Sequence, residues 1–182
     1  MKSIVDVIKA LDKLVRTGWL LRGVPPSIAE TVASHSFTSA IIALEVANKL
    51  RDRNRNINPY KAAVLALVHD VGEAFIGDIV KEFSKRSKIK EEVEEQVLKE
   101  YLDGLAIGKL AVEYISQKTL EARIAKLAEV LATYIKGLEY MALGYRDVKE
   151  IVENMLTEAM RLSKELKVES ILEEVVSLAE HR

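Results

Sequence analysis

The chain has 182 residues, of which 49% are hydrophobic and 30% are charged, and its formal net charge at pH 7 is −1. This composition is globular rather than disordered and suits one domain with a substantial core. The near-neutral charge argues against a general binder of nucleic acids or membrane surfaces. The absence of cysteine excludes disulfides and thiolate zinc sites, which leaves histidine and carboxylate side chains as the expected metal ligands.

No targeting or membrane segment is evident in the sequence. No apolar stretch reaches the roughly 18 residues that a membrane-spanning helix needs. Residues 1–14, MKSIVDVIKALDKL, have the pattern of a charged amphipathic helix rather than a signal peptide. We therefore expect a cytoplasmic protein.

The first half of the chain is predicted to be helical. Ser3 is a candidate N-cap for a first helix over 3–17, and the glycines and prolines of GWLLRGVPPS (18–27) then interrupt the helical pattern. A second helix is predicted over 31–50. Asn58 followed by Pro59 is a typical helix start, and it opens a third helix that runs into LALVHDVGEAFIGDI (65–79).

The second half has the same helical periodicity. Residues 81–100 carry dense mixed charge, and we expect a loop followed by a solvated helix with Val93, Val97 and Leu98 facing inward. Further helices are predicted over 110–116, 119–143 (ending at Gly144), 147–166 and 170–181. No segment has a convincing strand pattern, so the predicted fold class is all-α.

The stretch 65–79 ends an apolar helical run with four ionisable side chains, His69, Asp70, Glu73 and Asp78. One interpretation is a surface cluster in which His69 caps the helix end. However, the preceding AAVLALV (62–68) is too apolar to be exposed, and burying several unpaired carboxylates would cost several kcal/mol. A divalent cation removes that penalty, so we interpret the cluster as a metal site.

A second histidine, His35, lies within the predicted helix over 31–50. A lone helical histidine is more often a hydrogen-bonded core residue than a ligand. His69 and its neighbour Asp70 change that balance, because a helical bundle brings ligands from different helices into one groove. The third histidine, His181, is next to the last residue and is left out of the site.

Four segments of the chain resemble one known family. They are RTGWLLRGV (16–24), ETVASHS (30–36), LALVHDVGEAFIGDI (65–79) and EARIAKLAEVLATYIKGLEYMALG (121–144). Together they are similar to the HD-domain superfamily of metal-dependent phosphohydrolases, and within it to the HD-domain 5′-deoxynucleotidases. The resemblance implies a single HD-domain helical bundle over 1–182. Its core spans about 11–145, and the helices in 146–182 pack on that core or on a dimer partner.

The resemblance also implies a set of metal ligands. Two histidines and two carboxylates would hold one divalent ion, cobalt, manganese or similar, and the matching positions here are His35, His69, Asp70 and Glu129. Glu129 is a departure, because the family has aspartate there. Ser34 is another, because an acidic residue is usual before the first histidine, and we expect it to affect how His35 is oriented.

Further roles follow from the same resemblance. Glu73 and Asp78 would flank the phosphate and assist proton transfer, with Asp78 the better candidate for protonating the leaving oxygen. The other implied roles concern substrate binding: Arg16 or Arg22 would bind phosphate, Trp19 would shape the sugar pocket and Glu113 would contact the sugar. From spacing alone, two surface arginines and a core tryptophan are an equally good interpretation. Tyr114, Tyr134 and Tyr140 are expected in the core.

The expected activity is removal of the 5′-phosphate from nucleoside monophosphates, most of all deoxyribonucleotides, by a metal-activated water. The substrate is thus a small-molecule nucleotide rather than a nucleic acid polymer, and the resemblance implies a homodimer. Two alternatives stay open. Glu129 and Ser34 are also consistent with an HD-fold protein of weakened catalysis that acts in nucleotide binding or as a scaffold. A third possibility is an HD phosphohydrolase for another phosphate ester.

Overall fold

Helices make up most of the described chain, which comprises residues 3–53, 55–79 and 89–180 of a computed structural model. Within these residues the extended structure is limited to an isolated antiparallel bridge between Val15 and Thr31, so the prediction of an all-α fold is confirmed. The helices are α1 (Ile4–Lys13), α2 (Thr17–Leu20), α3 (Val32–Asp52), α4 (Pro59–Val68), α5 (Glu73–Ile76), α7 (Ile89–Tyr101), α8 (Ala106–Ser116), α9 (Leu120–Ala142), the 3₁₀ turn η1 (Arg146–Val148), α10 (Lys149–Leu166) and α11 (Glu169–Glu180).

Local capping signals explain where several helices begin. Ser3 forms a capping box with Asp6, as each side chain accepts a hydrogen bond from the other's backbone N–H. Thr31, Asn58 and Thr119 each accept a backbone N–H from the first turn of α3, α4 and α9. The predicted helix starts at Ser3 and Asn58 are therefore confirmed.

The predicted first helix over 3–17 is wrong at its end. Helix α1 stops at Lys13, because the next residues turn to pair with the segment before α3. Leu14 accepts the N–H of Val32 at 2.8 Å, and Arg16 donates its N–H to Glu30 O at 2.9 Å. This tertiary pairing overrides the local helical pattern and fixes the backbone at Arg16.

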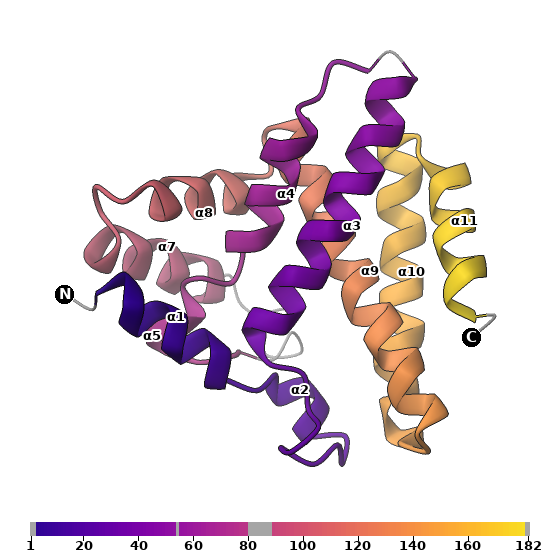
Figure 1. Cartoon of the computed structure of the whole chain (residues 1–182), viewed down its shortest axis with the longest axis horizontal. Coiled ribbons are helices and arrows are strands. Elements are labelled where there is room, and N and C mark those ends of the chain that lie inside the picture. Colours follow the sequence, from indigo (N-terminus) through magenta and orange to yellow (C-terminus); the bar gives the residue numbers. More distant parts are fainter. Residues whose placement is uncertain (1–2, 54, 80–88, 181–182) are drawn as a thin grey trace.

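Helix α9 lies at the centre of the main core. Its side chains Ile124, Leu127 and Leu131 are almost fully buried, and α3, α4 and α10 all pack against it. Figure 1 shows α3 and α4 as antiparallel neighbours, with α9 and α10 beside them. Helix α9 is thus packed directly against α3, which contains His35, and against α4, which ends just before His69 and Asp70.

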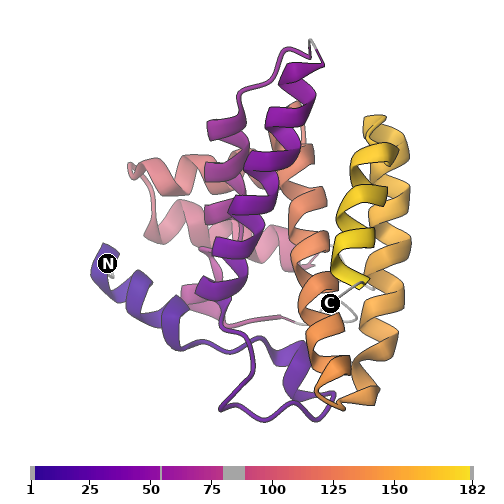
Figure 2. The same cartoon turned by 45° about the vertical axis from the view of Figure 1, so that its right-hand side comes forward.

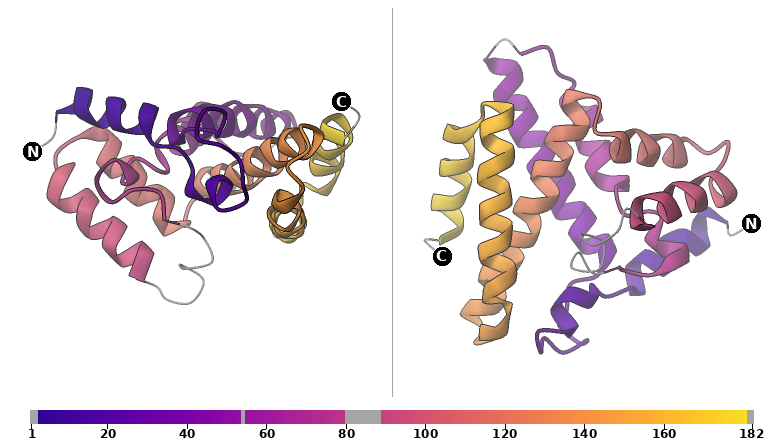
Figure 3. Two further views of the ribbon diagram at one scale, coloured as in Figure 1. Left: turned by 90° about the horizontal axis from the view of Figure 1, so that it is seen from below. Right: turned by 180° about the vertical axis from the view of Figure 1, so that it is seen from behind.

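The C-terminal helices cover the far side of α9. Figure 2 shows α11 beside α10, and the rear view in Figure 3 shows α10 lying along α9. Gly137 permits this close approach, because a Cβ at that position would lie 2.5 Å from Val152 Cγ2 and 3.5 Å from the ring of Trp19. A Cβ at position 137 would therefore require the Val152 side chain to shift.

A smaller apolar cluster joins α1, α5, α7 and α8 on the other side of the molecule. Its buried members include Val7, Leu98 and Ala111. Leu98 is buried as predicted, whereas Val93 and Val97 are only half-buried. The remainder of the predicted loop, 81–88, and His181 lie outside the described residues. No described helix is both long and apolar enough to cross a membrane.

Candidate metal centre

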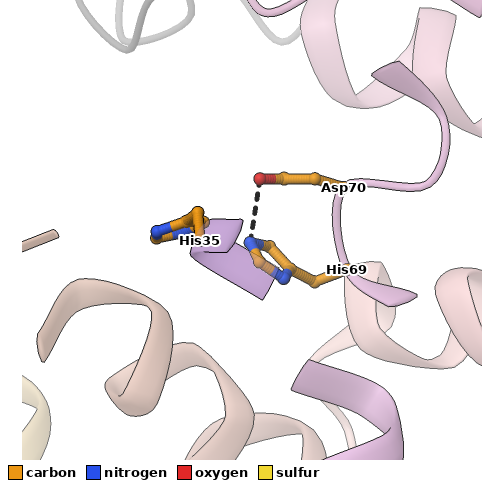
Figure 4. Close-up of side chains that lie close together, drawn as sticks. All are labelled: His35, His69 and Asp70. Carbon is orange, nitrogen blue, oxygen red and sulfur yellow. Dashed lines mark ion pairs between the residues drawn. The ribbon is translucent and has the colours of Figure 1, made fainter. Parts of the chain in front are cut away.

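Three predicted ligands meet where α3 passes the end of α4. His35 comes from the second turn of α3, whereas His69 and Asp70 directly follow α4. One potential ligand atom from each residue lies within 4.8 Å of those of the other two. Figure 4 shows the three side chains together, with a dashed line from the His69 ring to Asp70. The structure therefore brings His35 together with two residues that follow it by 34 and 35 positions in the sequence.

The end of α4 explains how two adjacent residues face one site. In a continuous helix, neighbouring side chains diverge by about 100°. Here His69 is the C-cap of α4, and the chain turns before α5 begins at Glu73. His69 Nδ1 lies 2.7 Å from Ala66 O, and its Nε2 lies 2.9 Å from Asp70 Oδ2. The turn thus folds the Asp70 carboxylate back onto the imidazole.

The donor atoms of this cluster fit a divalent cation. Among the described residues, neither ring nitrogen of His35 nor Nε2 of His69 makes a hydrogen bond, although all three atoms are buried. An unsatisfied buried polar group costs about 1–3 kcal/mol, a penalty that metal ligation removes. Two imidazoles and a carboxylate suit borderline metals such as cobalt, manganese or zinc. We conclude that the residues present match the metal that an HD motif implies.

The protonation states also suit a ligand set. Burial, with the charges of Arg16 and His69 adding to it, holds the pKa of His35 well below its ordinary value. His35 is thus neutral at pH 7, which is the form that binds metals. Burial raises the pKa of Asp70, but His69 and Arg16 outweigh that effect and hold it well below its usual range. Asp70 is therefore ionised.

The fourth predicted ligand, Glu129, is buried on α9 but is engaged by other partners. It accepts hydrogen bonds from the Tyr114 hydroxyl and from Lys126 Nζ, the latter at 2.7 Å. Among the described residues, the close three-residue cluster does not include its carboxylate. The Tyr114 ring in turn packs against His69, with centroids 5.3 Å apart. Both hydrogen bonds are accepted by Oε2 of Glu129, and its role as a ligand stays a prediction.

Arg16 lies directly beside the cluster. Its Nη1 donates to Asp70 Oδ2 at 3.0 Å, and both side chains are only 13% exposed. Burial alone would lower the pKa of the guanidinium, yet the surrounding carboxylates, Asp70 first among them, raise it above its ordinary value. A permanently charged arginine fork with an edge near the metal ligands is the arrangement that phosphate recognition needs.

The charges of the two predicted catalytic carboxylates, Glu73 and Asp78, act on this arginine. Glu73 opens α5 one turn after His69 and is 2% exposed. Asp78 follows Gly77, which adopts φ +81° and redirects the chain, and its Oδ2 accepts the backbone N–H of Thr17. Both side chains act electrostatically on Arg16. The structure therefore gathers Glu73 and Asp78 around the Arg16–Asp70 pair.

The other residues predicted to bind substrate, Arg22, Glu113 and Trp19, contact other parts of the protein. Arg22 pairs with Glu150 of α10 at 2.9 Å, and Glu113 pairs with Lys61 at 2.7 Å. Trp19 is 2% exposed and packs edge-on against Tyr140 in the main core. The interpretation of Trp19 as a core residue agrees with this burial. Because Trp19 is buried, a sugar could contact only the small exposed part of its side chain and could not stack on the ring.

Sequence reasoning missed Glu30, the first residue of the ETVASHS segment. Its carboxylate is buried between Trp19 Nε1, at 3.2 Å, and His35 Nδ1, at 3.8 Å. Ser34, in contrast, is exposed on the first turn of α3, where its N–H donates to Thr31 Oγ1. The sequence offered one signal, an acidic residue five positions before a predicted ligand, His35. That spacing could not be interpreted without knowing how the chain turns before α3.

Comparison with known proteins identifies the class of protein. The model of the HD domain family matches residues 8–169, so the chain belongs to the HD domain family, as the sequence predicts. Within that family it is 30% identical to the protein named 5′-deoxynucleotidase HDDC2 of Danio rerio over 149 residues, which cover 79% of this chain and 70% of that protein.

Solved structures of archaeal proteins have the same fold. A conserved hypothetical protein of Pyrococcus furiosus is 34% identical, with a TM-score of 0.80, and the match covers 95% of this chain and 99% of that one. A protein of Pyrococcus horikoshii is 32% identical, with a TM-score of 0.81, over 94% of this chain and 95% of that one. The likeness therefore extends over nearly the whole chain.

Proposed function

We propose that the chain is a metal-dependent phosphohydrolase that removes the 5′-phosphate from nucleoside monophosphates, with deoxyribonucleotides as the preferred class. The observation that carries the proposal is the cluster of His35, His69 and Asp70 with Arg16 bound to its edge. Similarity to proteins named 5′-deoxynucleotidases supports the substrate class. We expect the enzyme to act in the cytoplasm.

The roles of the residues follow from their chemistry. His35, His69 and Asp70, together with Glu129, would hold one divalent ion. When bound, that ion would polarise the phosphoryl oxygens and increase the acidity of a water. Arg16 would bind the phosphate through the edge of its fork that does not contact Asp70.

Two carboxylates then serve the proton transfers. Glu73 would accept the proton of the attacking water. Asp78 would protonate the leaving 5′-oxygen through Oδ1, since Oδ2 accepts the N–H of Thr17. Both carboxylates act electrostatically on Arg16, which supports placing them near the phosphate.

Release of inorganic phosphate tests the proposed activity. The metal-stripped protein is supplied with cobalt or manganese and assayed with dAMP, dGMP, dCMP and TMP beside the matching ribonucleotides. Turnover that depends on the added metal and favours the deoxyribonucleotides is expected. Nucleotide binding without turnover would instead support the alternative of an HD-fold binding or scaffold protein. Turnover only of cyclic nucleotides or nucleoside triphosphates would identify a different phosphate ester as substrate.

Arg16 gives a sharper test of the phosphate site. A charge-assisted hydrogen bond contributes about 1.5–3 kcal/mol, so Arg16→Gln is expected to raise KM for dAMP by about 10- to 100-fold. Cobalt affinity should not fall, because the substitution removes a positive charge beside the metal ligands. Arg22→Gln is the matched comparison, and its pairing with Glu150 predicts little change. Steady-state kinetics with cobalt titration separate the two effects. A loss of cobalt affinity with unchanged KM would reduce Arg16 to a structural partner of Asp70.

We also infer a homodimer. Large apolar side chains are exposed at helical spacing on α3 and α4, namely Phe37, Ile41, Tyr60, Val64 and Leu67. The two helices are antiparallel neighbours (Figure 1). Exposed apolar side chains of this kind suit an interaction surface, and a two-fold axis would bury them against those of a second copy. Sedimentation velocity should then give twice the mass of the 20.4 kDa chain. A monomer at micromolar concentration would contradict the inference.

A further inference from the structure

The carboxylate of Glu30 is buried, and burial of an ionised group without enough hydrogen-bond donors costs free energy. Its side chain and that of His35 have no exposed surface. Oε2 accepts the Trp19 Nε1–H at 3.2 Å, whereas Oε1 is buried and makes no hydrogen bond with any described residue. A buried carboxylate with spare acceptor capacity requires a further donor, because one indole N–H does not compensate for its desolvation. The nearest ring nitrogen is His35 Nδ1, at 3.8 Å from Oε2.

The backbone holds Glu30 firmly beside His35. Its N–H donates to the Tyr140 hydroxyl at 2.7 Å, and that hydroxyl donates to Ile28 O at 3.1 Å. Its carbonyl accepts the N–H of Arg16 at 2.9 Å. These contacts come from α9 and from the segment after α1, so the carboxylate is fixed from two sides of the core.

The other ligating histidine has a matching arrangement. His69 has its Nδ1 at 2.7 Å from Ala66 O and its Nε2 toward Asp70. That pattern leaves the Nε2 lone pair for a metal, because Nδ1 carries the proton. Metal-bound histidines nearly always donate their second ring N–H to a carbonyl or carboxylate, and this contact fixes the tautomer and the ring orientation. In His35, the atom equivalent to Nδ1 of His69 faces Glu30.

We propose that Glu30 is the positioning residue of the metal centre, where it accepts the Nδ1–H of His35 and so presents Nε2 to the cation. Glu30 touches neither substrate nor metal and acts only through His35. The inference rests on the proposed function for the presence of a cation. It concerns cation binding alone, so failure of phosphate release would leave it intact.

The histidine tautomer of the unaltered chain tests this directly. Long-range ¹⁵N–¹H correlation spectra of the metal-free protein distinguish Nδ1–H from Nε2–H imidazoles, and His35→Gln assigns the resonances of that ring. The Nδ1–H tautomer is expected for His35. Finding mainly Nε2–H there would overturn the proposal, whatever the variants do.

Cobalt affinity tests the consequence. Glu30→Met removes the acceptor at similar volume, and the loss of such a contact to a ligand costs roughly 10- to 100-fold in metal affinity. Glu30→Gln keeps an acceptor oxygen and should restore most of it. The matched control is Tyr134→Phe, which removes a hydroxyl of α9 that donates to Glu180 and not to the Glu30 segment, and it should bind cobalt within a few-fold of the unaltered chain.

Calorimetry on metal-stripped protein measures these affinities, and circular dichroism verifies folding. Unchanged affinity in Glu30→Met would refute the positioning role. An equal loss in Tyr134→Phe would also refute it, since the effect would then be general disruption of the core. If Glu30→Met does not fold, the tautomer of the unaltered chain and the affinity of Glu30→Gln decide the matter.

Discussion

Replacing His69 with alanine is expected to remove both cation binding and phosphate release. His69 supplies one of the two imidazoles of the cluster and lies next to its third member, Asp70. A bound metal ion contributes several kcal/mol of transition-state stabilisation, and each 1.36 kcal/mol is a tenfold change in rate. We therefore expect turnover of dAMP to fall by about 10²- to 10⁴-fold.

The control for this loss is His181→Ala, because His181 lies outside the predicted site. Cobalt content by elemental analysis and phosphate release are measured on both variants, and thermal unfolding verifies that each is folded. The two properties should be lost together in His69→Ala and kept together in His181→Ala. A His69→Ala protein that binds no cobalt yet hydrolyses dAMP normally would contradict a metal-dependent reaction.

Replacing Glu73 with glutamine should separate chemistry from metal binding. Glu73 is buried one turn after His69, yet the close cluster of described ligand atoms is formed by His35, His69 and Asp70 without it. A positioned proton acceptor contributes about 10²- to 10⁴-fold to rate, so kcat should fall by this factor. Cobalt affinity should stay within a few-fold, because glutamine keeps the size of the side chain.

Glu139→Gln provides the matched control on an exposed carboxylate that pairs with Lys136 on α9. It is expected to change neither kcat nor cobalt affinity. Two results for Glu73→Gln would revise the account. A parallel loss of cobalt would make Glu73 a ligand, and unchanged kcat would transfer the proton-accepting role to another group.

Local signals in the sequence were sufficient to predict most of the helices. Asn58 and Pro59 predict the start of α4 because capping and the fixed φ of proline act within one turn. The apolar run before His69 also predicts a buried helix end, because the pattern lies within that helix itself. Boundaries set by distant contacts could not be predicted, and the break after Lys13 is the example. It depends on hydrogen bonds between residues 14–16 and residues 30–32.

The same distinction applies to the site. His69 and Asp70 form a recognisable motif, and resemblance extends it to His35 and Glu129. The contacts around these residues are tertiary, so periodicity carries no information about them. Arg16 reaches Asp70 across 54 positions, and Tyr114 reaches Glu129 from a different helix. The one-methylene difference between Glu129 and aspartate could be identified from sequence, but its partners Tyr114 and Lys126 could not.

The most direct test of the central claim is an anomalous diffraction measurement at the cobalt edge on crystals grown with cobalt. The claim is that one cation is bound jointly by residues from separate helices. It predicts a single strong peak within about 2.0–2.2 Å of an imidazole nitrogen of His35, one of His69 and a carboxylate oxygen of Asp70. A cobalt-saturated crystal with no peak between these three side chains would contradict the account.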